Sequence, residues 1–134
     1  MRLLMDSRLE SVAGAGHAVR RYAVEAGLDA TAASDLELAT VEAANNIIKH
    51  GFGNAPDKSY SIRIETRDGE VQVALRDNGT EIPPSVLAVE PPVWSLDAEA
   101  SRGLAIMRAC ADRLEYRRAG GRNLLVLAKR LPGL

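Results

Sequence analysis

The apolar residues of this chain change their spacing near residue 60, and that change restricts the fold more than any other feature. Upstream they recur at helical spacing over residues 7–27 and again up to about residue 50. Downstream, residues 60–66 and 71–75 alternate between apolar and polar, which is typical of half-buried strands. Asp68-Gly69 between them predicts a two-residue hairpin turn. The chain is therefore predicted to place helices first and hairpins afterwards.

Further elements complete this order. A short apolar run over residues 3–5 predicts a first strand, residues 102–112 predict a third helix, and a last hairpin is expected around Gly120-Gly121. Thr31 and Ser34 are candidate N-caps for the second helix. The pattern favours an α+β fold, a two-layer sandwich whose mixed, mainly antiparallel sheet is covered on one face by helices.

Bulk composition excludes several classes of protein. The 134 residues fit one domain, predicted over 1–134, and the net charge of -1 provides no electrostatic case for direct binding to nucleic acid or to anionic membranes. A single cysteine, Cys110, cannot form an internal disulfide and is interpreted as a small buried side chain. No apolar stretch approaches a signal-peptide core or a membrane span, so the chain is expected to be cytoplasmic.

Residues 80–101 have no regular period and contain four prolines, at positions 83, 84, 91 and 92. A loop of this length inside a compact domain is usually functional, and it is predicted to be a lid over a site. Trp94 lies within it, either as a packing anchor or as part of a partner surface.

The stretch EAANNIIKHGF contains the first group of candidate functional residues. Glu42 and Asn46 are four residues apart and project from one helix face, with Lys49 and His50 one turn later. An amide oxygen is a hard ligand suited to Mg²⁺, and a carboxylate can deprotonate a nucleophile. The alternative is a solvated polar helix face with an internal hydrogen bond.

Two further stretches add to this group. In RDNGTEIPP, Asp77 ends a strand, where it would accept a hydrogen bond from an exocyclic amine such as that of adenine, or would only shape a turn. In SRGLAIMRACADRLEY, Gly103 is expected to open a helix whose free N–H groups would bind phosphate, although an ordinary loop-to-helix junction has the same signature.

Together, in this order and spacing, the three stretches resemble the N, G1 and G2 boxes of the GHKL (Bergerat-fold) ATPase superfamily. Within it the chain looks like the small anti-sigma-factor serine/threonine kinases of the RsbW/SpoIIAB type, and the resemblance covers nearly the whole chain. It implies ATP and Mg²⁺ as cofactors. It also implies a STAS-type anti-sigma antagonist as the phosphorylated partner, a sigma factor or another regulator as a second partner, and a homodimer.

The resemblance also implies individual roles. Glu42 matches the general base, Asn46 the Mg²⁺ ligand, Asp77 the adenine-reading carboxylate, Gly79 the glycine beside the base, and Gly103 a glycine on the phosphates.

Four more residues are predicted to contact the nucleotide. Arg102, from its position, would stabilise charge on the γ-phosphate, and Lys49 and His50 belong to the same predicted site. Asn123 occupies the place where many relatives have a threonine that supports adenine binding.

The chain departs from the family pattern at three positions. Glu81 replaces a glycine of the G1 box, Ser101 stands where the G2 box often has glycine, and Asn123 replaces the threonine. These departures leave open an alternative, in which the chain is a non-catalytic, degenerate Bergerat-fold module that sequesters a regulatory partner.

Overall fold

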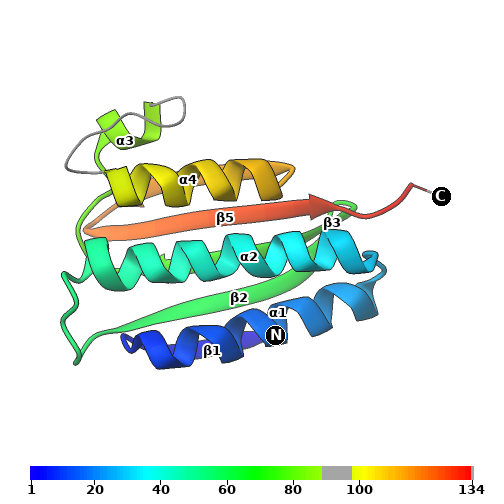
Figure 1. Ribbon diagram of the computed structural model, residues 1–134, viewed down its shortest axis with the longest axis horizontal. Coiled ribbons are helices and arrows are strands. Elements are labelled where there is room, and N and C mark those ends of the chain that lie inside the picture. Colours follow the sequence, from blue (N-terminus) through cyan, green and yellow to red (C-terminus); the bar gives the residue numbers. More distant parts are fainter. Residues whose placement is uncertain (89–97, 134) are drawn as a thin grey trace.

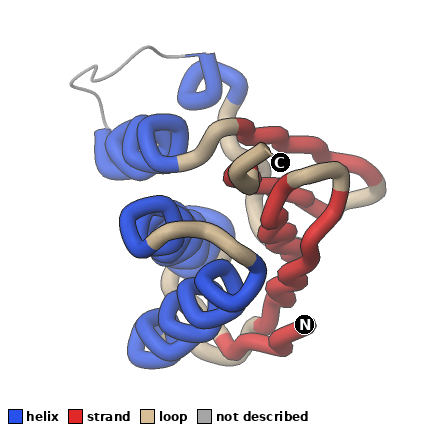
Figure 2. Tube along the Cα trace, turned by 90° about the vertical axis from the view of Figure 1, so that its right-hand side faces the viewer, coloured by secondary structure: helices blue, strands red, loops and turns tan. Residues whose placement is uncertain are grey.

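The computed structural model describes residues 1–88 and 98–133, and in it a sheet and a layer of helices pack face to face (Figure 1, Figure 2). The sheet has five strands in the order β1-β2-β3-β5-β4. The strands are β1 (Arg2–Asp6), β2 (Ser59–Arg67), β3 (Glu70–Asp77), β4 (Arg113–Ala119) and β5 (Arg122–Arg130). All four strand pairings are antiparallel. The predicted fold class is confirmed, and the described sheet is wholly antiparallel.

The helical elements cover only one face of the sheet (Figure 2). They are η1 (Leu9–Ser11), α1 (Val12–Ala26), α2 (Ala30–Asn46), η2 (Ile47–Gly51), α3 (Pro84–Ala88) and α4 (Ala98–Cys110). None of the helices in the described ranges is long and apolar enough to cross a membrane.

Alternation along the strands explains this one-sided cover. Ile62, Ile64, Val73 and Leu75 are fully buried against the helices, while the residues between them face outward. The turn predicted at Asp68-Gly69 is confirmed, since both residues have positive φ, at 54° and 74°. The alternation and the turn therefore set the buried face of the central strands.

The N-terminal boundaries of the first two helices were predicted wrongly. Ser7 lies before η1, where its hydroxyl donates to the carbonyl of Ala55 at 2.6 Å. The N-cap of α2 is Asp29, whose carboxylate accepts from the backbone N–H of Ala32 at 2.8 Å, so Thr31 and Ser34 lie inside the helix. Asp29 has an extended backbone and comes first along the chain, so it takes the capping position before either hydroxyl.

The start of α4 also differs from the prediction. The helix begins at Ala98 rather than near Arg102, so Gly103 is interior to it and its N–H is not one of the free groups at the helix N-terminus. Residues 98–101 read Ala-Glu-Ala-Ser, and alanine and glutamate are good helix formers, which explains the earlier start. Part of the predicted lid, including Trp94, lies outside the described residues.

Candidate functional site

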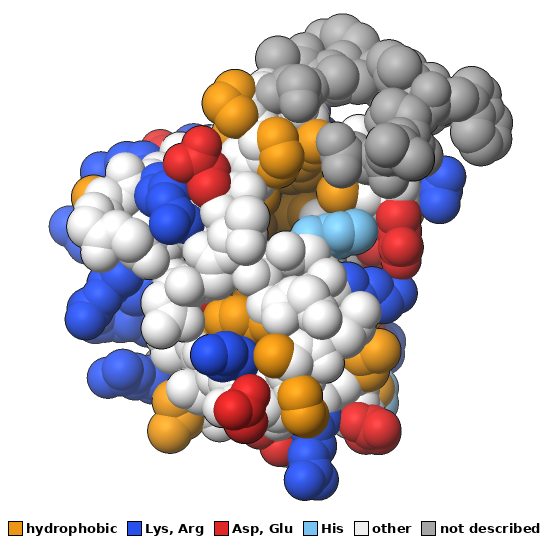
Figure 3. Space-filling view, turned by 90° about the vertical axis from the view of Figure 1, so that its left-hand side faces the viewer, with side chains coloured by type: hydrophobic (Ala, Val, Ile, Leu, Met, Phe, Trp, Pro, Cys, Tyr) orange, Lys and Arg blue, Asp and Glu red, His pale blue; other side chains and the backbone are white. Residues whose placement is uncertain are grey.

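A cavity of about 220 Å³ lies between the C-terminal end of α2, the ends of β3 and β5, and α4. Figure 3 shows it as a hollow with a hydrophobic interior and a histidine at its rim. Its polar lining includes Asn46, His50, Asp77, Thr80, Glu81, Tyr116 and Asn123. An apolar cleft with a few convergent polar groups is the usual form of a small-molecule site.

The type of helix changes where the chain borders this cavity. Asn46 is the last residue of α2, and η2 continues directly from it as one turn of π-helix. Such turns are rare and frequently occur at functional sites. His50 of this turn lines the cavity, whereas Lys49 forms an ion pair with Glu99 of α4 at 2.9 Å. Lys49 therefore ties η2 to α4 and does not line the cavity.

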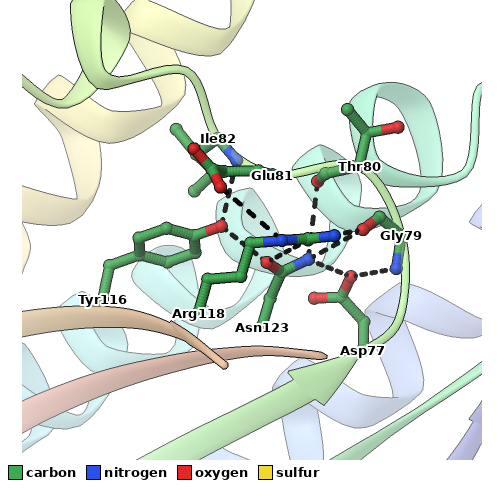
Figure 4. A network of polar contacts seen from close by, with 8 residues as sticks. All are labelled: Asp77, Gly79, Thr80, Glu81, Ile82, Tyr116, Arg118 and Asn123. Carbon is green, nitrogen blue, oxygen red and sulfur yellow. Dashed lines mark hydrogen bonds and ion pairs between the residues drawn. The ribbon is translucent and has the colours of Figure 1, made fainter. Parts of the chain in front are cut away.

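Asp77 is held in a fixed orientation at the cavity wall (Figure 4). Its Oδ1 accepts hydrogen bonds from the backbone N–H of Gly79 at 2.8 Å and from Nδ2 of Asn123 at 2.9 Å. Within the described residues no hydrogen bond engages its second oxygen, so that oxygen is available to accept a further hydrogen bond.

Asn123 lies directly opposite Asp77 in the sheet register and is only 3% exposed. Besides Asp77, its amide donates to the carbonyl of Gly79 at 3.1 Å, and its Oδ1 accepts from the Tyr116 hydroxyl at 2.7 Å and from Arg118 at 2.8 Å. The hydrogen-bonding groups of the Asn123 side chain are thus all engaged by the protein itself. It holds Asp77 in place at the cavity wall.

Tyr116 and Arg118 extend this network to Ile82 and Glu81, at the start of the predicted lid. The Tyr116 hydroxyl accepts the backbone N–H of Ile82 at 3.0 Å, and burial raises the pKa of that phenol. Arg118 donates to the carbonyl of Gly79 at 2.9 Å and lies 3.5 Å from the Glu81 carboxylate. Glu81 therefore has a cationic neighbour that offsets its charge, although it lines the cavity.

Two glycines allow close backbone approach around the cavity. A Cβ on Gly79 would lie 2.5 Å from the carbonyl oxygen of Gly51, and Thr80 donates its N–H to that same oxygen at 2.7 Å. A Cβ on Gly103 would lie 3.0 Å from the side-chain amide of Asn46. Each glycine thus has a packing role that any larger residue would disturb.

The structure brings together only some of the predicted residues. Asn46, His50, Asp77 and Asn123 line the cavity. The other five predicted residues, Glu42, Lys49, Gly79, Arg102 and Gly103, are not among its lining residues.

The positions of these five residues differ. Glu42 is half-buried one helical turn before Asn46, and within the described chain no hydrogen bond or ion pair engages it. Arg102 is exposed on α4.

Tyr116 and Arg118 were missed by the sequence analysis. Counting outward from the hairpin at Gly120-Gly121 places Arg118 opposite Asn123, as observed. This hairpin register could have identified Arg118 as a neighbour of the site from the sequence.

The donor set agrees with the way that proteins hold Mg²⁺. No group of three or more His, Cys, Asp or Glu residues able to hold a metal occurs among residues 1–88 and 98–133. Asn46 and Asn123 both contribute amide groups to the cavity lining, and the Asn123 oxygen already accepts from Tyr116 and Arg118, which leaves the Asn46 oxygen as the amide ligand among the described residues. Mg²⁺ usually takes one or two protein ligands and completes its shell with water and substrate phosphates, so the residues present fit such an ion.

Comparison with known proteins identifies the class. Residues 5–129 match the model of the histidine kinase-like ATPase domain. The chain is 33% identical over 116 residues to an anti-sigma F factor of Clostridium botulinum, covering 85% of this chain and 81% of that protein. It therefore belongs to the histidine kinase-like ATPase family, in the branch that contains the anti-sigma F factors.

Two further similarities agree with this placement. The chain is 32% identical over 94 residues to the serine/threonine-protein kinase BtrW of Bordetella bronchiseptica, covering 69% of this chain and 66% of that protein. The crystal structure of the RsbU and RsbW domains of Rv1364c from Mycobacterium tuberculosis shares the fold, with a TM-score of 0.69 and 18% identity over 98% of this chain and 31% of that one. An ATPase or kinase activity of the anti-sigma type is the function that these relationships support.

Proposed function

We propose that the protein is an ATP-dependent serine/threonine kinase that phosphorylates a STAS-type anti-sigma antagonist in the cytoplasm and also binds a sigma factor or another regulator. One observation carries the proposal. Asp77 is locked by Asn123 and the Gly79 N–H at one wall of an apolar cavity, and Asn46 lines that same cavity. An acceptor fixed beside an apolar slot suits an adenine ring, and an amide oxygen suits the metal that accompanies phosphates.

The residues divide the reaction between them. Asp77 would accept the exocyclic amine of adenine, and Asn46 would hold Mg²⁺, which supplies charge neutralisation on the phosphates when it is bound. Glu42 would take the proton from a partner's serine or threonine hydroxyl as the hydroxyl oxygen bonds to the γ-phosphorus and the bond to the β–γ bridging oxygen breaks, releasing ADP.

His50 at the rim and Arg102 on the exposed side of α4 would meet the phosphates. The Lys49–Glu99 pair would release Lys49 toward the same phosphates if α4 shifts. The interior position of Gly103 gives it a different role: it lets α4 approach Asn46 closely.

The second candidate is a non-catalytic module that grips a regulatory partner. The observation in its favour is Glu81, a carboxylate that lines the cavity and would repel phosphates despite its 3.5 Å neighbour Arg118. The two candidates differ in whether adenine nucleotides bind and whether Glu42 is required for phosphate transfer.

Thermal unfolding with ATP or ADP, with and without Mg²⁺, tests nucleotide binding. Nucleotide at about a hundred times its dissociation constant should stabilise the fold by roughly 2.7 kcal/mol. Asp77→Asn should lose this shift, while Glu42→Gln should keep it and lose phosphate transfer to a purified STAS-domain protein. No shift at millimolar nucleotide would exclude the kinase, and undiminished transfer by Glu42→Gln would exclude the assigned base.

A further inference from the structure

No helix of the described chain covers the outward face of the sheet (Figure 2). This face is hollowed and its lining is rich in arginine. A concavity of about 580 Å³ lies over it. Arg2, Arg76, Arg117 and Arg122 line it, one each from β1, β3, β4 and β5. Figure 3 shows Lys and Arg side chains gathered along this side of the molecule, at the left of that view. We refer to these residues and the surface between them as the basic sheet face.

The positive charge of the basic sheet face is not neutralised within the protein. No carboxylate of the described chain lies within ion-pair distance of its four arginines. The carboxylates on the outward side of the strands already have partners, as the pairs Arg63–Glu65 at 3.6 Å and Arg113–Glu70 at 2.9 Å show. Because the chain as a whole has a net charge of -1, this local excess results from placement and not from composition.

The sheet register arranges these side chains in a row. Leu4, Ser61, Arg76, Leu124 and Arg117 are successive cross-strand neighbours over all five strands. Neighbouring strands are about 4.8 Å apart, so Arg76 and Arg117 lie roughly 10 Å from each other with Leu124 between them. Leu4 at the end of the row is 79% exposed. The row thus combines cationic and apolar groups, as the contact surfaces of protein partners do.

We infer that the basic sheet face is a docking surface for an acidic segment of a partner protein, one in which carboxylates alternate with apolar side chains. Such a segment would pair its carboxylates with Arg76 and Arg117 and would cover Leu4 and Leu124.

A second copy of this chain fits the surface poorly, because a twofold axis through it would set arginines against arginines. Nucleic acid fits less well too. The only aromatic residue among those around the concavity, Tyr60, is buried on the helix-covered side, so the described surface has no ring on which bases could stack.

The docking surface is distinct from the nucleotide cavity but shares a wall with it, since Asp77 and Asn123 line both. The inference does not depend on ATP binding, and its test is made without nucleotide so that its failure is separable from failure of the proposed kinase activity.

Fluorescence anisotropy with the full-length protein would test the proposal. The probe is a fluorescein-labelled peptide of repeating Glu-Glu-Leu units, and a labelled single-stranded oligonucleotide of equal charge serves as the comparison. The double variant Arg76→Glu/Arg117→Glu should bind the peptide about tenfold or more weakly than wild type. Arg20→Glu/Arg21→Glu, which makes the same charge change on the exposed side of α1, should bind it as wild type does.

Three checks make the outcome decisive. Arg76→Gln/Arg117→Gln should show a smaller loss, and raising the salt from about 50 to about 200 mM should weaken wild-type binding. No binding of the peptide, an equal loss in both reversal variants, or tighter binding of the oligonucleotide would overturn the proposal. A dimer in analytical ultracentrifugation that the Arg76/Arg117 reversal dissociates would also overturn it.

Discussion

Replacing Asn123 by alanine should loosen Asp77 and destabilise the fold. The substitution removes the amide that donates to Asp77 at 2.9 Å and to Gly79 at 3.1 Å, and the oxygen that accepts from Tyr116 at 2.7 Å. A neutral hydrogen bond contributes about 1 kcal/mol and a bond to a charged group about 2 kcal/mol, so the loss is about 3–4 kcal/mol before any collapse of the site. For a domain of this size, such a loss lowers Tm by about 10 °C.

Urea unfolding followed by circular dichroism measures the free energy directly. Asn78→Ala is the matched control, because Asn78 is exposed and adjacent to Asp77. That control should change the free energy of unfolding by less than about 0.5 kcal/mol. Tyr116→Phe, which removes one donor to Asn123, should fall between the two. A loss below about 1 kcal/mol for Asn123→Ala, or an equal loss for Asn78→Ala, would refute the positioning role of Asn123.

Three more predictions concern the rest of the fold. Gly79→Ala should lower the free energy of unfolding by about 2–4 kcal/mol, because its Cβ would lie 2.5 Å from a backbone carbonyl oxygen of η2. Gly14→Ala, with no atom within 4 Å of its Cβ, should instead stabilise α1 by about 1 kcal/mol. Equal effects of the two substitutions in denaturant titrations would contradict the steric explanation. Tyr60→Phe should raise stability by about 1 kcal/mol, because within the described chain the buried hydroxyl has no hydrogen-bond partner. Burial raises the pKa of Tyr60 from 10.0 to about 12. Wild-type stability should therefore fall between pH 10 and 12, where only the unfolded phenol ionises. A stability that stays constant over this range would refute the raised pKa of Tyr60. The hydrogen bond from Arg113 holds the pKa of Glu70 below 4.5, so this pair stabilises the fold above pH 4.5 and the stabilisation is lost as acid protonates the carboxylate. Glu70→Gln should therefore remove this pair's share of the loss of unfolding free energy in acid, measured by unfolding titrations at several pH values.

Much of the fold was predictable because its signals are local. Alternation in residues 60–66 and 71–75 follows from which side chains face the core, and the Asp68-Gly69 turn follows from the positive φ that a tight hairpin needs. Helix boundaries were less predictable, because several capping residues compete within a few positions, as Asp29, Thr31 and Ser34 do.

The candidate site was predictable in composition but not in geometry. Sequence spacing identified Asn46 and Asp77, and the structure places both at one cavity. It could not show that Gly103 packs on Asn46 from inside a helix, or that Lys49 pairs with Glu99, since both contacts depend on how α4 lies on α2.

By itself, the sequence determined the order of the long helices and the strands, the buried face of β2 and β3, and the hairpin turns, because each depends on residues a few positions apart. Only the tertiary structure decided that β5 lies between β3 and β4 and so brings Asn123 to Asp77, 46 residues earlier in the chain. It also decided that arginines from four strands share one uncovered face. Such juxtapositions come from packing between distant segments, and no local period encodes which strand will be the neighbour of which.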